Sequence, residues 1–270
     1  MTQETMNAVP AGKPSALWNE EGGALGVWCN LPDIHVAETV ARSGAQWLCF
    51  DLQHGLMDFS DLLTLLPAVT GTGITVLVRV ASNTPDQIGR ALDFGAHGVI
   101  VPMVNSVEEA KAAAEACRYP PQGVRSCGPM RPAMLEGLPY LASANERVMC
   151  FPMIETEQGL AAVNEIAGVS GVDGLFVGPM DLCFGLGIAP GDFGNPAFSA
   201  AINSILSACQ NAGIAPGMFG YDAALARLAL DQGFKFASVG SDISFFRAGL
   251  TEAMTVASGQ ATEKPPSAGY

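Results

Sequence analysis

The chain has 270 residues, of which 49% are hydrophobic and 14% charged, and its 26 acidic residues outnumber 13 basic ones. This length suits one large domain, and barrels of about 250 residues are a common single-domain outcome. The excess of acids argues against a protein that grips nucleic-acid phosphates or an anionic membrane, because both need clustered lysine and arginine. We therefore expect no nucleic-acid partner and no membrane partner.

The seven cysteines are odd in number, and no two of them have C-x-x-C spacing. This pattern predicts reduced, mostly buried thiols rather than a disulfide framework or a zinc site. Residues 1–23 carry acids and prolines instead of a basic start followed by an apolar stretch, so we expect no ordinary secretory signal. Together these features predict a cytoplasmic protein.

From Ala24 onward, eight short apolar or β-branched runs alternate with helical patterns, which is typical of successive βα units and a parallel sheet. Such alternation fits an open doubly wound sheet as well, but the count of eight favours a single-domain (β/α)8 TIM barrel. The expected strands are 25–30, 46–51, 75–80, 98–102, 148–154, 174–177, 215–219 and 236–240.

Several helix starts can be read from their capping residues. The segments Thr84-Pro85-Asp86-Gln87 and Ser106-Val107-Glu108-Glu109 each predict an N-cap with a capping box. Asn195-Pro196 predicts the start of a helix with one apolar face, and Gly213 predicts its end.

The sequence predicts that the chain divides into three parts. We expect a leader and capping segment at 1–23 with a short helix at 14–20, a barrel domain at 24–258, and a tail at 259–270. The longest connection without clear periodicity is 119–145, in a region that contains Arg118, Arg125 and Arg131. Long connections in compact domains are often functional.

In an α/β barrel the chemistry lies where the strands end, at their carboxyl edge. The polar side chains expected there are Asp51, His54, Arg79, Glu155 and Asp181. Two carboxylates on neighbouring strands suit a hard divalent ion that keeps open positions for water and a chelating substrate, so Mg²⁺ or Mn²⁺ fits best. Zinc usually takes three or four protein ligands, mostly His and Cys, and therefore fits less well. Co²⁺ could substitute for Mg²⁺ or Mn²⁺. The alternative is that each acid caps the helix that follows it.

Arg79 ends an apolar run, and burying a guanidinium without an anionic partner is costly. Its partner is expected to be a substrate carboxylate or a developing enolate oxygen, or else Asp51 or Glu155 in a structural ion pair. The other two histidines, His35 and His97, do not follow strands and are expected to be structural.

The four lysines, Lys13, Lys111, Lys235 and Lys264, all lie away from the strand ends, which argues against a Schiff-base mechanism. One competing signal is Gly240-Ser241-Asp242, which could form the phosphate-binding helix start common in barrels.

Several segments together resemble the HpcH/HpaI family of metal-dependent pyruvate aldolases, which includes 4-hydroxy-2-oxoheptanedioate aldolases. The resemblance runs from about Gly26 to Gly249. It rests on Gly26-Val27-Trp28, Phe50-Asp51-Leu52-Gln53-His54, Val78-Arg79-Val80, Gly98 to Val104, Arg118 to Arg125, Ile154-Glu155-Thr156 and Gly171 to Leu182.

The resemblance implies reversible cleavage of a 4-hydroxy-2-oxo acid into pyruvate, or hydroxypyruvate, and an aldehyde. It implies that Glu155 and Asp181 hold the metal and that Arg79 stabilises the enolate. It further implies that His54 transfers protons through a metal-bound water ordered by Asp51. The implied substrate-binding residues are Trp28, Gly178, Pro179, Met180 and Asp181.

The family also pairs the histidine with an aspartate that aligns with Asp93. Since Asp93 ends a helix, at the opposite face of its own barrel, it is expected to act from a neighbouring subunit. The resemblance implies an exchanged C-terminal helix and a homo-oligomer, a hexamer built as a trimer of dimers. Many relatives carry glutamate where this chain has Gln53. The alternative functions are a CoA-thioester lyase of the citrate lyase β or malyl-CoA lyase type, against which the acidic charge argues, and a phosphate-sugar isomerase barrel.

Overall fold

The computed structural model describes residues 22–259. Most of the predicted leader, including the expected helix at 14–20, and nearly all of the expected tail lie outside the described residues. The first strand begins at Ala24 and the last helix ends at Ala257. The proposed division into leader, barrel domain and tail stays a prediction.

Eight parallel strands close into a barrel in chain order, so the predicted TIM barrel is confirmed. Each strand agrees with its predicted range to within one residue at either end. The strands are β1 (Ala24–Cys29), β2 (Trp47–Asp51), β3 (Thr75–Arg79), β4 (Gly98–Val101), β5 (Met149–Ile154), β6 (Gly174–Val177), β7 (Ala215–Met218) and β8 (Phe236–Ser241).

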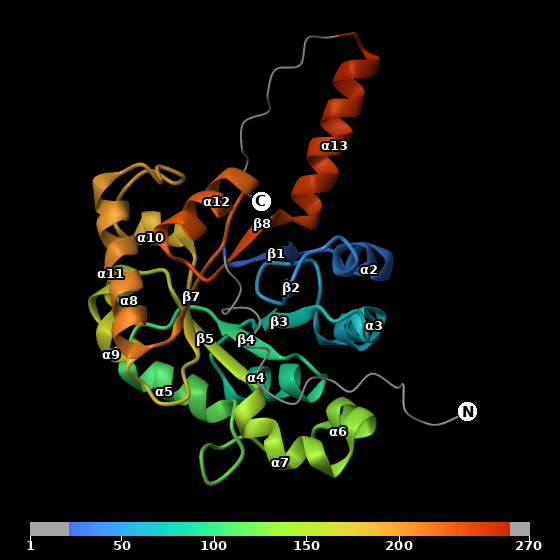
Figure 1. The fold of residues 1–270 in the computed structure, drawn as a ribbon, viewed down its shortest axis with the longest axis vertical. Helices are drawn as coiled ribbons and strands as arrows, with labels where there is room; N and C mark the ends of the chain where they lie inside the picture. The colour runs from blue at the N-terminus through green and yellow to red at the C-terminus, as the bar shows by residue number, and fades with distance from the viewer. Residues whose placement is uncertain (1–21, 260–270) are drawn as a thin grey trace.

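Helices lie around the outside of the barrel (Figure 1). They are α2 (Ile34–Ala41), α3 (Phe59–Val69), α4 (Pro85–Asp93), α5 (Val107–Ala116), α6 (Met130–Glu136), α7 (Leu138–Arg147), α8 (Glu157–Ala161), α9 (Val163–Ala167), α10 (Pro179–Gly185), α11 (Pro196–Ala212), α12 (Ala223–Gln232) and α13 (Asp242–Ala257). None of the helices within residues 22–259 is long and apolar enough to cross a membrane.

The predicted helix starts are found, but their capping contacts differ in detail. Ser106 caps α5 by accepting from the backbone N–H of Glu109, whereas the Glu109 carboxylate accepts from Asn105 and not from Ser106. Thr84 occupies the N-cap of α4 without a side-chain capping bond, so the capping box predicted there is wrong. Asn195 and Gly213 begin and end α11 as predicted.

The barrel interior is filled by large aromatic side chains. The rings of Trp47 and Phe236 meet edge to face with centroids 5.5 Å apart, a favourable arrangement for aromatic pairs. Gly26 leaves room for this packing, because a β-carbon at Gly26 would lie 2.1 Å from the Trp47 ring. The floor of the barrel is therefore a packed core, and only its carboxyl end is available for ligands.

His97 has the structural role that its position predicted. Its Nδ1 accepts a hydrogen bond of 2.9 Å from the backbone N–H of Val76, at the start of the neighbouring strand. Burial is the main cause that lowers the pKa of His97, to about 4, so the side chain is neutral in the folded protein.

The connection at 119–145 is mostly helical, because it contains α6 and most of α7. The arginines in and next to this connection bind protein groups. Arg118 donates to Asp173 at 2.9 Å, and Arg125 donates to Asp93 at 2.7 Å.

The last helix, α13, projects away from the barrel instead of packing along it (Figure 1). Only Asp242, its first residue, is buried. Large apolar side chains on the rest of the helix are exposed: Phe245, Phe246, Leu250, Met254 and Val256.

Candidate active site

Asp51 and Arg79 form a buried ion pair at the carboxyl ends of β2 and β3. The two residues are register partners on adjacent parallel strands, so their side chains emerge side by side. Arg79 Nε donates to Asp51 Oδ1 at 2.8 Å, and Nη2 donates to Oδ2 at 2.5 Å. Of the two partners considered for Arg79 in a structural ion pair, Asp51 is the one that binds it.

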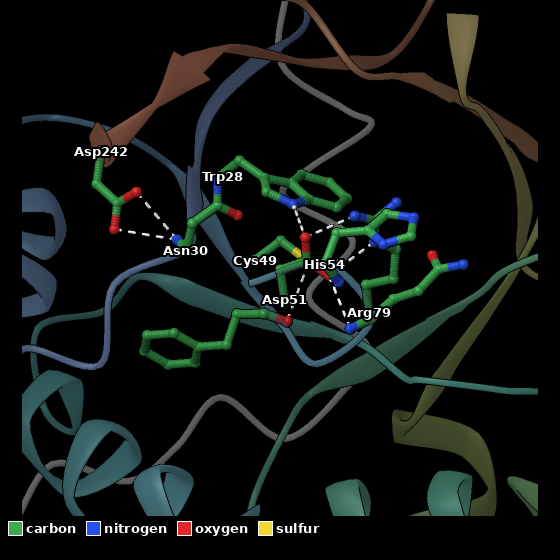
Figure 2. A network of polar contacts seen from close by, with 9 residues as sticks. Trp28, Asn30, Cys49, Asp51, His54, Arg79 and Asp242 are labelled. Carbon is green, nitrogen blue, oxygen red and sulfur yellow. Dashed lines mark hydrogen bonds and ion pairs between the residues drawn. The ribbon is translucent and has the colours of Figure 1, made fainter. Parts of the chain in front are cut away.

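Trp28, at the end of β1, completes this network (Figure 2). Its Nε1 donates to Asp51 Oδ2 at 3.1 Å, and the Arg79 guanidinium carbon lies 5.1 Å from the centre of a Trp28 ring. Burial raises the pKa of Asp51, but the hydrogen bonds and charge of Arg79, with further hydrogen bonds, hold that pKa below its usual value. These contacts favour the carboxylate form of Asp51, which fixes the orientation of both neighbours.

His54 lies in the turn after β2, beside Asp51 and Arg79 (Figure 2). The backbone N–H groups of Gln53 and His54 donate to Asp51 Oδ1 at 3.0 and 3.2 Å. Asp51 thus shapes the turn that presents the imidazole, which is exposed. The Oε1 atom of Gln53 is buried without a hydrogen-bond partner among the described residues.

Glu155, directly after β5, is buried, with 2% of its surface exposed. It does not cap the following helix, because Thr156 is the N-cap of α8. Its Oε1 accepts from the backbone N–H of Met103, at the end of β4, at 2.6 Å. Burial is the main cause that raises the pKa of Glu155, and the negative charge of Asp181 raises it further.

A small pocket opens beside this network at the carboxyl end of the barrel. It contains four residues that the resemblance assigned to the substrate, and Met180 and Glu155 are not among its lining residues. The lining consists of Trp28, Arg79, Met153, Gly178, Pro179, Asp181, Phe219 and Tyr221. Asp181 lies in the first turn of α10, where a negative charge is favourable.

The donor set fits a hard divalent ion. Glu155 and Asp181 follow neighbouring strands, and the mutual repulsion that raises the pKa of Glu155 would be relieved by a cation. Within residues 22–259 no group of three or more His, Cys, Asp or Glu side chains could hold a metal, so these two carboxylates would leave open positions. Gly178 leaves space for this arrangement, since a β-carbon there would lie 2.6 Å from Glu155 Oε2.

Asp93 lies apart from these residues within the subunit. It is the last residue of α4, and helices of this fold run opposite to the strands, so it lies at the amino end of the barrel. Its carboxylate accepts from Arg125, whose side chain is fully buried. Burial raises the pKa of Asp93 in spite of this ion pair.

The phosphate-binding role considered for Gly240-Ser241-Asp242 is not tested by the structure, but side chains of the chain already accept from the N–H groups of Ser241, Ile243 and Ser244 at this helix start. Asp242 accepts from the N–H group of Asn30 (Figure 2) and from those of Leu31 and Ile243, at 2.7 to 3.0 Å. A phosphate at this point would meet the buried negative charge of Asp242.

Three contributors to the site were missed from the sequence: Met103, Met153 and Tyr221. Tyr221 lines the pocket from the loop after β7, and its edge contact with Phe219, 4.7 Å between ring centres, extends the aromatic wall. Met103 contributes only a backbone N–H, which no side-chain pattern could reveal. The position of Tyr221 just beyond a strand end was the one available signal.

Comparison with known proteins agrees with this geometry. The family model described as HpcH/HpaI aldolase/citrate lyase matches residues 24–248. A hydroxypyruvate/pyruvate aldolase of Rhizorhabdus wittichii is 38% identical over 237 residues, which cover 87% of this chain and 94% of the relative. A pyruvate aldolase of Rhizobium etli is 39% identical over 227 residues, which cover 83% of this chain and 89% of the relative.

A solved structure extends the likeness to the whole barrel. It is an HpcH/HpaI aldolase/citrate lyase family protein from Burkholderia cenocepacia J2315, with 31% identity, a TM-score of 0.79, and coverage of 87% of this chain and 94% of that one. The resemblance inferred from the sequence motifs is confirmed. The chain belongs to the HpcH/HpaI aldolase/citrate lyase family.

Proposed function

We propose that this chain is a divalent-metal-dependent 2-oxo acid aldolase that cleaves a 4-hydroxy-2-oxo acid reversibly into pyruvate, or hydroxypyruvate, and an aldehyde. The observation that carries the proposal is the meeting of Arg79 and Asp181 in one pocket, with Glu155 directly behind Gly178. The names of the relatives from Rhizorhabdus wittichii and Rhizobium etli support the same reaction and the same class of 2-oxo acid. A cytoplasmic location stays a prediction from composition.

Glu155 and Asp181 would hold the metal, for which Mg²⁺ or Mn²⁺ is the best fit and Co²⁺ a substitute. When bound, such an ion would polarise the keto and carboxylate oxygens of the 2-oxo acid and so make the neighbouring C–H bond more acidic. The backbone amides from Gly178 to Asp181 are proposed to hold the substrate carboxylate, with Pro179 and Met180 shaping that wall.

Arg79 supplies positive charge where negative charge develops on the substrate oxygen. Its two bonds to Asp51 prevent the guanidinium from turning, so the charge is oriented before the substrate arrives. Asp51 therefore orients Arg79 and shapes the turn that carries His54, and its expected role in ordering a metal-bound water stays a prediction. Trp28 covers the guanidinium and forms one wall of the pocket.

His54 is proposed to transfer the proton of the C4 hydroxyl group during cleavage and to return it during addition. A histidine suits this task because its unperturbed pKa lies close to neutral pH. Asp93 of a second copy is proposed to orient this imidazole, because within one chain Asp93 ends α4 at the other end of the barrel.

The exposed apolar face of α13 is a second argument for an assembly of several copies. An isolated helix of 16 residues that exposes Phe246, Leu250 and Met254 gains stability only by burying this face. We propose that α13 packs against a neighbouring subunit, in an exchange of C-terminal helices, and that the protein is a homo-oligomer. The hexamer implied by the resemblance is the proposed assembly.

The proposed reaction is tested by hydrogen exchange. Protein supplied with Mg²⁺ or Mn²⁺ is mixed with pyruvate in deuterated water, and the methyl signal is followed by proton NMR. Exchange that stops on addition of a chelator is the expected result, because loss of the metal removes the acidifying charge. Persistent exchange after complete removal of metal, or trapping of an imine by borohydride, would refute the proposal.

Matched variants test whether the hydrogen exchange of pyruvate depends on the proposed metal ligands. Glu155→Ala and Asp181→Ala should each abolish it, whereas Glu157→Ala, which removes an exposed carboxylate two residues from Glu155, should leave it unchanged. A panel of 4-hydroxy-2-oxo acids screened for release of pyruvate or hydroxypyruvate then identifies the preferred aldehyde.

A further inference from the structure

Met103 has an unusual backbone conformation beside Glu155. Its φ of 57° makes it the one non-glycine residue between 22 and 259 in the left-handed region, which is unfavourable for a residue with a β-carbon. In this conformation its backbone N–H donates to Glu155 Oε1 at 2.6 Å. The neighbouring structure must therefore hold Met103 in place.

The side-chain amide of Asn105 spans the two strand ends that meet here. Its Nδ2 donates to the carbonyl oxygen of Met103 at 2.9 Å. Its Oδ1 accepts from the hydroxyl group of Thr156, the residue directly after Glu155. One amide thus ties the residue that donates to Glu155 to the residue that follows Glu155.

Both ends of this bridge are anchored. The backbone N–H of Asn105 donates to Glu109 Oε2 at 2.6 Å, which joins the bridge to the first turn of α5. The Thr156 hydroxyl accepts from the N–H of Gly159 at 3.0 Å. Gly159 also allows close packing, because a β-carbon there would lie 2.7 Å from the carbonyl oxygen of Val104.

We propose that Asn105 is a positioning residue for the metal site. By fixing Met103 and Thr156 together, it keeps the Met103 N–H on one oxygen of Glu155, so the carboxylate cannot turn and Oε2 stays on the side of Gly178. This inference rests on the proposed role of Glu155 as a metal ligand. Groups that orient a ligand typically change metal affinity about 10- to 100-fold when they are removed.

The test measures Mn²⁺ affinity directly, by electron paramagnetic resonance of free Mn²⁺ during titration. Asn105→Ala is expected to raise the dissociation constant about 10-fold. Asn83→Ala is the matched control, because Asn83 Nδ2 donates to the backbone carbonyl of Glu109 at 3.0 Å without touching Glu155. The control should leave Mn²⁺ affinity unchanged, and thermal unfolding should show that both variants are folded.

A second substitution separates positioning from general loosening. Glycine adopts the left-handed conformation without steric cost, so Met103→Gly in the Asn105→Ala background should recover several-fold of the lost affinity. If Asn105→Ala instead acts by making the backbone more mobile, adding Met103→Gly should lower Mn²⁺ affinity further, because glycine adds backbone freedom. Wild-type affinity in Asn105→Ala, an equal loss in Asn83→Ala, or no recovery with Met103→Gly would each overturn the inference.

Failure of the proposed function gives a different result. If the unmodified protein binds neither Mn²⁺ nor Mg²⁺, the proposed role of Glu155 as a metal ligand is wrong, and the inference about Asn105 is wrong as well. If the unmodified protein and Asn105→Ala bind Mn²⁺ equally well, only the role of Asn105 is wrong.

Discussion

Replacement of Asp51 by alanine would remove the centre of the buried network at the barrel mouth. Asp51 is fully buried and accepts five hydrogen bonds, two of them from the Arg79 guanidinium. Arg79 itself is only 4% exposed, so the substitution removes the carboxylate that accepts two hydrogen bonds from a buried guanidinium. Breaking such a pair by removing one partner typically costs about 3–5 kcal/mol.

A double-mutant cycle separates the ion pair from the other contacts of Asp51. Arg79→Met should also cost about 3–5 kcal/mol, since it leaves the Asp51 carboxylate buried and unpaired. The double variant should lose less than the sum of the two single variants, by about 2–3 kcal/mol, because neither charge is then left alone.

The assay is urea unfolding in metal-free buffer at one fixed protein concentration, because the stability of the proposed oligomer would depend on concentration. Asp231→Ala is the control, since it breaks the exposed ion pair between Asp231 and Arg227 on α12 and should leave the urea midpoint unchanged. If Asp51→Ala loses no more stability than this control, or if the two single losses simply add, the account of the network is wrong.

Three further predictions concern other parts of the molecule. Gly178→Ala should raise the Mn²⁺ dissociation constant about 10-fold, because the added β-carbon lies 2.6 Å from Glu155 Oε2 and must displace it; an unchanged constant contradicts the space argument. The pKa of His97 is lowered to about 4, below its unfolded value, so the unfolded chain binds the proton first as the pH falls. Stability should drop by about 2 kcal/mol between pH 7 and pH 5, and His97→Gln should remove that part of the loss in urea titrations. Replacing Phe246 and Leu250 by aspartate should lower the assembly size in sedimentation velocity, and an unchanged sedimentation coefficient would rule out α13 as an interface helix.

The barrel could be predicted from the sequence because its signals are local. Apolar runs predicted all eight strands, and the residues at their carboxyl ends predicted Arg79 and Asp181, which line the pocket. Strand order then followed from the barrel, since consecutive βα units place successive strands side by side.

Features that depend on the path of the backbone could not be predicted in this way. The left-handed conformation of Met103 leaves no mark in composition, and its contact with Glu155 joins residues that are 52 positions apart. The apolar pattern of α13 did not show its direction, because an apolar face looks the same whether it packs on its own barrel or on another subunit; an exchanged helix was expected only from the family resemblance. Sequence also suggested a phosphate site at 240–242, because a Gly-Ser turn does not show that the side chains of Ser241, Asp242 and Ser244 will accept from the N–H groups of this helix start.

The place of Trp28 gives the protein a built-in optical probe. The indole of Trp28 touches Asp51 and Arg79 and forms a pocket wall, whereas Trp47 is sealed inside the barrel. Any ion or oxo acid that enters the pocket should change the electric field around the indole of Trp28 and leave that around Trp47 undisturbed. The difference in emission between unmodified protein and a Trp28→Phe variant would then report occupancy in solution, without a label or a coupled assay.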